Sequence, residues 1–474
     1  MERKNAWEKY DEKEREEVFA FAEGYKDFLS ACKTERECAA FFKQKAKEAG
    51  FIDINDVIAE NIRLKAGDRV FADNKGKNLA LFIIGQRPLE EGMNILGAHI
   101  DSPRLDLKQN PLYEDTDLAL LDTHYYGGIK NYQWVTLPLA LHGVIAKKDG
   151  SVVEINIGED PDDPVFGVSD LLIHLASDQM QKKAGAAVAG EALDVLVGSM
   201  PAVSEKKEED EDGDDKKKKK SAKKVQDNIL KILKDTYDIE EEDFLSAEIE
   251  VVPAGRARDY GLDRSMVMGY GHDDRVCAYP SFIAALEMEI PEKTSVCLLV
   301  DKEEIGSVGA TGMHSKFFEN MVAEIINACG DYSELKVRRA MTNSCMLSSD
   351  VSAAYDPNYP ETMEKKNSAY FGRGLVFNKY TGSRGKSGSN DAGAEYVARI
   401  RKIMDDGKVS FQTAELGKVD QGGGGTIAYI LGNYNMQVID SGLAVLNMHA
   451  PWEIISKADL YEAKRGYAEF LKNA

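Results

Sequence analysis

Two adjacent carboxylates, Glu303 and Glu304, follow, after two intervening residues, an apolar run at residues 295–300 that is typical of a buried strand. At such a strand end, one carboxylate can bind a metal ion while its neighbour acts as a general base toward a water molecule. An isolated Glu-Glu pair is more often ordinary solvated surface. The pair therefore becomes informative only through other residues that could complete a hydrolytic metal site.

A second candidate position is the end of the apolar run 93–98, which is followed by His99 and, two residues later, by Asp101. Residues spaced by two leave a strand on the same side. Asp101 can then accept a hydrogen bond from the ring of a metal-bound His99 and fix its tautomer. For this short motif alone, a capped loop is the plainer interpretation.

Three further residues follow strand-like runs or turns of the same alternating α/β pattern, namely Asp273, Asp350 and His449. With His99 and Glu304 they provide two imidazoles and three carboxylates. This is a plausible set for a pair of Zn²⁺ ions bridged by one carboxylate and a water. The same ligand types also suit Mn²⁺ or Co²⁺.

The elements that must position these residues fall into two kinds of region. Residues 1–104 and 250–474 alternate helix-like and strand-like patterns. Residues 105–249 instead show the short alternating stretches of β-rich structure. The pattern predicts an α/β protein whose first domain is interrupted by an inserted, β-rich domain.

Composition narrows the classes of protein. The 474 residues are 43% hydrophobic and 30% charged, which is typical of a soluble globular protein of two or three domains. The net charge of −21 argues against nucleic-acid and anionic-membrane binding. The six cysteines form no Cys-x-x-Cys pair and are interpreted as buried, reduced thiols. With no signal peptide and no apolar run near the ~20 residues of a membrane span, a cytoplasmic location is predicted.

Residues 205–224 combine an acidic block with five consecutive lysines, Lys216 to Lys220. This composition predicts a disordered, charged surface loop. A nucleic-acid patch is the alternative, but the lysines lie beside their own acidic block in a very acidic chain. The solvated loop is the interpretation that we adopt.

Six motifs, in order over nearly the whole chain, resemble the aspartyl aminopeptidase and vacuolar aminopeptidase I family of dinuclear metallopeptidases. They are His99-Ile100-Asp101-Ser102-Pro103, Asp273-Asp274, Asp301 to Ser307, Ser349-Asp350, Asp356-Pro357-Asn358-Tyr359 and Asn447-Met448-His449. The resemblance implies an aminopeptidase that acts on peptides through a zinc-peptidase α/β/α sandwich domain. It also implies that the inserted domain serves dimerisation or acts as a lid, in a homo-oligomer built from dimers, usually a dodecamer.

The resemblance also assigns roles. It implies that two zinc ions are bound by His99, Asp273, Glu304, Asp350 and His449. Asp273 would bridge the ions, Glu303 would be the general base, and Asp101 would support His99. In related sites a cis peptide bond joins the bridging aspartate to a second Asp or Asn, and Asp274 matches that follower.

His174, within the apolar segment 170–176, resembles the histidine that family members extend across a dimer interface toward the neighbour's active site. A satisfied core or interface histidine is the equal alternative. The remaining histidines are expected to have structural or surface roles; they are His124, His142, His272 and His314.

Two departures from the family concern specificity. Asn378 stands where aspartyl-specific members have a lysine, and Lys379 comes one residue later. The polar residues that usually follow Tyr126-Gly127-Gly128 are replaced by a largely apolar stretch at 134–139. Acidic or neutral N-terminal residues are therefore both expected as substrates. A carboxypeptidase or deacylase of the same architecture and a silent oligomeric scaffold are the alternatives, although the full ligand set with Glu303 argues against the scaffold.

Overall fold

The computed structural model describes residues 4–202 and 224–474. Its contacts divide the chain into a larger unit, Met1–Ser102 with Arg256–Ala474, and an inserted unit, Pro103–Gly255. The charged segment predicted at 205–224 lies outside the described residues except for its last residue. That residue, Lys224, is the first of helix α4, so the helix begins where the sequence predicted a loop.

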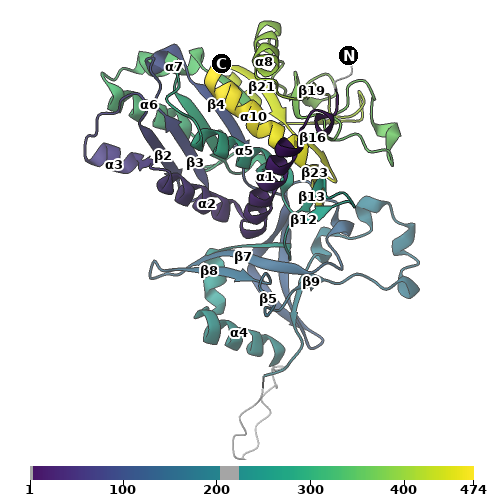
Figure 1. The fold of residues 1–474 in the computed structure, drawn as a ribbon. Helices are drawn as coiled ribbons and strands as arrows, with labels where there is room; N and C mark the ends of the chain where they lie inside the picture. The colour runs from purple at the N-terminus through teal and green to yellow at the C-terminus, as the bar shows by residue number, and fades with distance from the viewer. Residues whose placement is uncertain (1–3, 203–223) are drawn as a thin grey trace, which may run out of the picture. The chain divides into compact units, whose positions relative to one another are not determined.

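A nine-stranded sheet forms the centre of the larger unit (Figure 1). In spatial order its strands are β1 (Ile52–Asp53), β2 (Arg69–Asn74), β3 (Asn78–Ile83), β14 (Ser295–Val300), β4 (Asn94–His99), β15 (Cys345–Ser349), β21 (Gln437–Gly442), β17 (Leu375–Asn378) and β19 (Phe411–Thr413). The four strands from β14 to β21 are parallel, with Val300 opposite His99 and Ser349 opposite Ser441. Their carboxyl ends therefore meet at one edge of the sheet.

Two layers of helices cover this sheet. The apolar cluster on one face includes α1 (Glu12–Ala31), α2 (Glu35–Glu48), α5 (His272–Leu286), α8 (Ala394–Asp406) and α10 (Lys457–Asn473). The cluster on the other face includes α3 (Ile54–Ala59), α6 (Phe317–Cys329), α7 (Glu334–Asn343) and α9 (Ala428–Gly432). Alternate residues of β3 divide between the two clusters, as the period of two in a strand requires. The predicted α/β/α sandwich is thereby confirmed.

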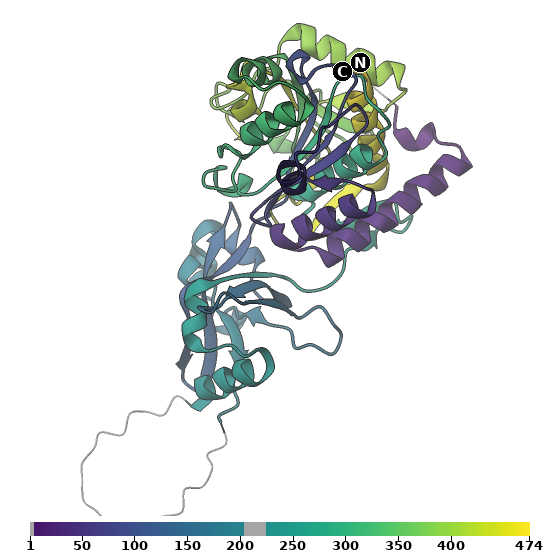
Figure 2. The same ribbon diagram turned by 90° about the vertical axis from the view of Figure 1, so that its left-hand side faces the viewer.

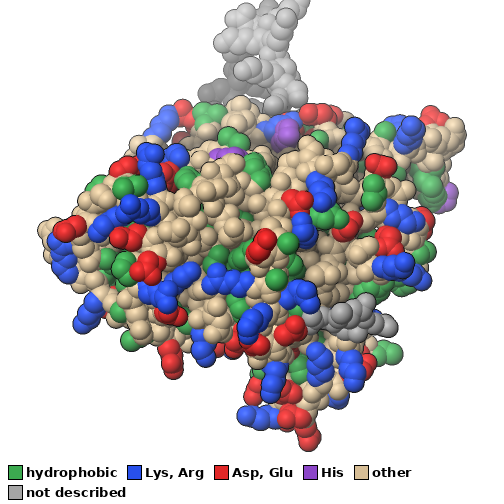
Figure 3. All heavy atoms as spheres, turned by 90° about the horizontal axis from the view of Figure 1, so that it is seen from above, with side chains coloured by type: hydrophobic (Ala, Val, Ile, Leu, Met, Phe, Trp, Pro, Cys, Tyr) green, Lys and Arg blue, Asp and Glu red, His purple; other side chains and the backbone are tan. Residues whose placement is uncertain are grey.

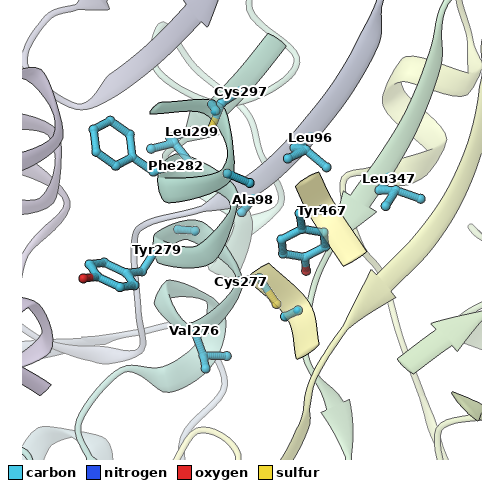
Figure 4. Packing of buried hydrophobic residues seen from close by; sticks show 14 of the residues in the cluster. Leu96, Ala98, Val276, Cys277, Tyr279, Phe282, Cys297, Leu299, Leu347 and Tyr467 are labelled. Carbon is cyan, nitrogen blue, oxygen red and sulfur yellow. The ribbon is translucent and has the colours of Figure 1, made fainter. Parts of the chain in front are cut away.

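Helix α5 is packed on both sides. Figure 4 shows it lying over Leu96 and Ala98 of β4, with Cys277 near Tyr467 of α10. On its other side the ring centroids of Phe282 and Phe42 are 4.6 Å apart. Buried apolar contact of this kind is the main source of helix stability in proteins. The start of α5, which carries two aspartates, is therefore held firmly against the sheet.

A five-stranded sheet also belongs to the larger unit. Its strands are β12 (Arg258–Tyr260), β13 (Met266–Gly269), β23 (Glu453–Ser456), β22 (Ala444–Leu446) and β16 (Ser352–Ala353), and a separate two-stranded sheet pairs β18 (Gly382–Ser383) with β20 (Gly423–Gly424). β13 and β23 are antiparallel, and Gly269 lies opposite Glu453. The segment that follows β13 and the segment that precedes β23 therefore leave the same end of this strand pair.

The inserted unit is built on an antiparallel, seven-stranded sheet, so its predicted β-rich character is found (Figure 2). The strands in spatial order are β8 (Val152–Ile157), β7 (Leu139–Ala146), β11 (Ala247–Pro253), β5 (Arg104–Asp115), β6 (Leu118–Tyr126), β10 (Val195–Gly198) and β9 (Gly167–Val168). Helix α4 (Lys224–Tyr237) belongs to this unit. Between β9 and β10 the chain forms short 3-10 turns, including η4 (Ile173–Leu175).

Charged side chains of both signs are mixed on the surface of the protein. On the face shown in Figure 3, acidic and basic side chains are interspersed. The excess of acidic residues is therefore not gathered into one block on that face. Among the helices of residues 4–202 and 224–474, none has the length and apolar character needed to cross a membrane.

Candidate metal centre

His99, the last residue of β4, is buried at the sheet edge where the parallel strands end. Its Nδ1 lies 3.0 Å from the backbone oxygen of Asp101 and 3.3 Å from Asp101 Oδ1. A proton on Nδ1 would be donated to Asp101, which leaves Nε2 with its lone pair. Asp101 thus stands where it can fix the tautomer of His99.

Asp273 lies between two histidines. Its Oδ1 is 3.2 Å from His99 Nε2, and its Oδ2 is 3.2 Å from His449 Nε2. His449 Nε2 also lies 3.5 Å from Glu304 Oε1. A carboxylate that offers one oxygen to each imidazole has the arrangement expected of a ligand shared by two metal ions.

The backbone around Asp273 is shaped for a tight turn into α5. Gly271 has φ +75°, and a Cβ built there would lie 2.8 Å from Ser102 Oγ, so glycine suits the position. Ser102 Oγ donates a hydrogen bond of 2.7 Å to the backbone oxygen of Asp273. The Asp273–Asp274 peptide bond is cis, as the family resemblance implies.

Glu303 and Glu304 open the 3-10 turn η9 (Glu303–Ile305), which begins three residues after the last residue of β14. The two oxygens of Asp101 accept hydrogen bonds of 3.2 Å from the backbone N–H groups of Glu303 and Glu304. One buried carboxylate therefore contacts the ring of His99 and the backbone of both glutamates. This contact fixes η9 relative to the end of β4.

Asp350 follows β15 and joins the same group. One ligand atom from each of His99, Glu303 and Asp350 lies within 4.8 Å of the others, and the same holds for His99, Asp273 and Glu304. Asp273, Asp274 and Asp350 form a third such group. Four segments of the sequence, at 99, 273, 303–304 and 350, therefore converge at one sheet edge.

Burial makes this concentration of carboxylates unfavourable for the chain alone. Burial, and then Asp273, raise the pKa of Glu304 well above its usual range, and burial raises the pKa of Glu303 to about 7. Burial, followed by Glu303, also raises the pKa of Asp350 well above its usual range. Each shift reflects the cost of negative charge in a poorly solvated place. A bound cation would remove that cost.

The donor atoms fit zinc. Three of them, His99 Nε2, Asp273 Oδ1 and Glu304 Oε1, are buried and form no hydrogen bond among the described residues, although His99 Nε2 and Asp273 Oδ1 lie 3.2 Å apart. Buried polar atoms normally have partners, so each such atom calls for an explanation. Imidazole nitrogen and carboxylate oxygen are standard zinc ligands. Metal binding would satisfy all three atoms.

Sequence reasoning did not find Glu453, the first residue of β23. Its side chain is only 1% exposed. Oε2 accepts a hydrogen bond of 3.0 Å from the backbone N–H of Asp273, and Oε1 accepts one of 2.7 Å from the backbone N–H of His449. The available signal was a single acidic residue at the start of an apolar run, Glu453 before Ile454 and Ile455.

His174 lies in the inserted unit, in η4, and is exposed. Its neighbours are exposed and apolar, with Ile173 at 68% and Leu175 at 67%. The alternative of a buried core histidine is therefore excluded within the described chain. An exposed apolar segment around a histidine is the surface expected of an interface residue.

The positions singled out for specificity are both engaged. Asn378 is buried and accepts a hydrogen bond of 2.7 Å from Ser352 Oγ. Lys379 forms an ion pair with Asp391, which also pairs with Lys386 at 3.1 Å. Lys379 is therefore paired with a carboxylate of its own chain, which it shares with Lys386.

Comparisons with known proteins find similar sequences and structures over the whole chain. A family model described as "Aminopeptidase I zinc metalloprotease (M18)" matches residues 28–471. A probable M18 family aminopeptidase 1 of Clostridium acetobutylicum is 64% identical over 472 residues, covering 100% of this chain and 98% of the relative. The crystal structure of aminopeptidase I from Clostridium acetobutylicum superposes with a TM-score of 0.90 at 62% identity, covering 100% of both chains. That of an M18 family aminopeptidase from Thermotoga maritima has a TM-score of 0.92 at 43% identity, again over 100% of both.

Proposed function

The chain belongs to the aminopeptidase I family of zinc metalloproteases (M18), and from this premise we propose how it removes N-terminal residues from peptides. Five residues, His99, Asp273, Glu304, Asp350 and His449, would hold two zinc ions, and Asp273 would be the ligand that both ions share. The observation that carries this proposal is Asp273, which offers one carboxylate oxygen to each of two histidines. Held there, zinc would supply a Lewis acid for the scissile carbonyl and would generate a nucleophile at neutral pH.

Glu303 is the general base of this proposal. Its carboxylate lies in the same group of atoms as His99 and Asp350, next in sequence to ligand Glu304. Glu303 takes the proton of the attacking water and passes it to the leaving amine as the peptide C–N bond breaks. Asp101 keeps the backbone of Glu303 in place and orients the ring of His99. Through these two contacts, the carboxylate of Asp101 aligns the base Glu303 with the ligand His99.

The exposed apolar segment 171–175 supports a homo-oligomer. Leu171, Leu172, Ile173 and Leu175 are exposed large apolar side chains within five residues. Packing these side chains against a second copy of the chain would bury this surface, and contiguous exposed apolar patches commonly mark protein interfaces. His174 would then extend from one subunit toward the active site of its partner. There it would donate a hydrogen bond to the carbonyl oxygen as negative charge develops.

Both acidic and neutral N-terminal residues are proposed as substrates. An aspartyl-specific enzyme needs a cation for the substrate's carboxylate, yet Asn378 is neutral and Lys379 is paired with Asp391. A neutral N-terminal residue needs no such cation in the enzyme. The cytoplasmic location stays a prediction from the sequence.

Peptides blocked at either end test the reaction class. The zinc-loaded enzyme should cleave peptides with a free amino terminus and leave N-acetylated ones intact, whether or not the carboxyl terminus is amidated. Cleavage of N-acetylated peptides that requires a free carboxyl terminus would instead establish a carboxypeptidase. Removal of zinc with a chelator should abolish cleavage, and added zinc should restore it.

A further inference from the structure

Asp273 lies at the turn into α5, His449 lies in the loop before β23, and these two segments come from distant parts of the sequence. They are brought together because β13 and β23 pair antiparallel, with Gly269 opposite Glu453. The chain leaves β13 toward Asp273 and enters β23 after His449, at the same end of the strand pair. The register of β13 with β23 does not by itself fix the two segments beyond the end of the strand pair, because backbone outside the paired strands can move unless side chains hold it.

Glu453 contacts both segments at this point. One of its carboxylate oxygens accepts the N–H of Asp273 at 3.0 Å, and the other accepts the N–H of His449 at 2.7 Å. His449 has φ +65°, an uncommon backbone conformation for a residue with a side chain. The short hydrogen bond to its N–H therefore holds a backbone that has no intrinsic preference for this shape.

The arrangement parallels that of Asp101, which accepts the backbone N–H groups of Glu303 and Glu304. In each case one buried carboxylate bridges two backbone N–H groups of residues in the proposed site, the base Glu303 and the ligand Glu304 for Asp101, and two ligands for Glu453. Asp101 holds one side of the site and Glu453 the other. Asp101 in addition contacts a ligand ring, that of His99.

We propose that Glu453 is a positioning residue that sets the zinc affinity of the site by holding the backbones of Asp273 and His449 at a fixed separation. This inference rests on the proposed metal centre. It adds to that proposal a residue that binds no metal itself but holds the two ligands Asp273 and His449 in place before metal binds. Groups that orient metal ligands typically change metal affinity or activity by about 10–100-fold when they are substituted.

The test is a zinc titration of the metal-free protein against a chromophoric chelator, together with its thermal unfolding. In Glu453→Gln the amide keeps one acceptor oxygen but turns an N–H₂ donor toward the second backbone N–H. We expect its zinc affinity to fall by about 10–100-fold. Saturating zinc should return kcat close to the wild-type value. Glu453→Asp keeps the charge but is one methylene too short to reach both segments, so we expect an intermediate loss.

Asp459 in α10 offers a matched control. It too is fully buried, and its two oxygens accept backbone N–H groups from Gly374 at 2.6 Å and Gly372 at 2.9 Å. Neither glycine neighbours a proposed ligand. Asp459→Asn should lower the unfolding temperature of the metal-free protein while zinc affinity stays at the wild-type value. A purely structural role for Glu453 would make its variants behave in the same way as this control.

The outcomes distinguish a failure of the role proposed for Glu453 from a failure of the proposed metal centre. His449→Ala, which removes a proposed ligand, serves as the reference for lost zinc binding. If the Glu453 variants keep wild-type zinc affinity while His449→Ala loses it, the positioning proposal is overturned and the metal centre stands. If His449→Ala also keeps wild-type affinity, the metal centre itself is overturned.

Discussion

The proposed metal centre and the segment around His174 are built in opposite ways. At the metal centre, buried carboxylates accept backbone N–H groups of proposed ligands, as Asp101 does from Glu304 and Glu453 does from Asp273. The segment 171–175 instead exposes four large apolar side chains around its histidine. One region is arranged by contacts within the chain, and the other presents a surface that suits a second copy.

This difference suggests two kinds of group in the proposed site, those held in place within one chain and one supplied by a second subunit. Groups that must hold a metal within tenths of an ångström benefit from rigid, buried support. A group that contributes only when subunits assemble has no need of such support before assembly. The comparison predicts that single-chain substitutions at the metal centre act in every assembly state, whereas substitution of His174 acts through the partner subunit.

The largest effect is expected for Glu303→Gln. The amide keeps the size of the side chain but cannot accept the proton of the attacking water. We expect kcat to fall by at least ~10²-fold, the low end for general base catalysis, with bound zinc and oligomeric state unchanged. Steady-state kinetics with zinc analysis check this, and Glu334→Gln on the exposed face of α7 is the control. Near-wild-type turnover would remove Glu303 from the mechanism.

His174→Ala should lose roughly 10²–10³-fold in kcat, because it removes a hydrogen-bond donor to the developing oxyanion. Zinc content and oligomeric state should persist. Mixing this variant with Glu303→Gln subunits should restore activity, since one site of a mixed dimer then contains both wild-type groups.

The exposed His124 of the same unit provides the control, and His124→Ala should retain full activity. Two results would contradict the shared site. One is full activity in His174→Ala. The other is an inactive variant that no mixing rescues although subunit exchange is demonstrated by mass spectrometry.

Asp101→Asn should have a smaller effect, of about 10–100-fold in zinc affinity or activity. Asparagine keeps one acceptor for the backbone of η9 but presents an amide to the ring of His99 or to the second N–H. A zinc titration and kinetics at saturating zinc separate the loss of metal from the loss of turnover. An unchanged zinc affinity together with unchanged kcat would show that His99 is held without Asp101.

The smallest effect is expected for Asp391→Asn, which releases Lys379 from its ion pair. A lysine freed in this way could pair with an acidic substrate side chain. An exposed pair contributes up to about 1 kcal/mol, so kcat/KM for aspartyl over leucyl substrates should rise by up to about fivefold. A ratio that stays constant would place Lys379 outside the substrate pocket.

Much of the fold and of the candidate site could be predicted because the signals are local. An apolar run that ends in a polar residue marks a strand end, and His99 stands at such a place, while Glu303 lies three residues after the last residue of β14. The family resemblance, now confirmed, added the pairing of Asp273 with its cis neighbour Asp274.

Other features depend on contacts between distant segments. Glu453 acts on Asp273, 180 residues away, and only the register of β13 with β23 shows that the two meet. The pairing of Lys379 with Asp391 likewise depends on how a loop folds back. Lys224 looked like the end of a charged loop, yet it belongs to α4, an amphipathic helix in which the next residue, Val225, is buried.

Zinc-edge anomalous diffraction from crystals of the wild-type protein tests the central claim most directly. The account predicts two anomalous peaks per chain with Asp273 between them, the first beside His99 and the second beside His449. A single peak, or peaks that lie away from these residues, would contradict it.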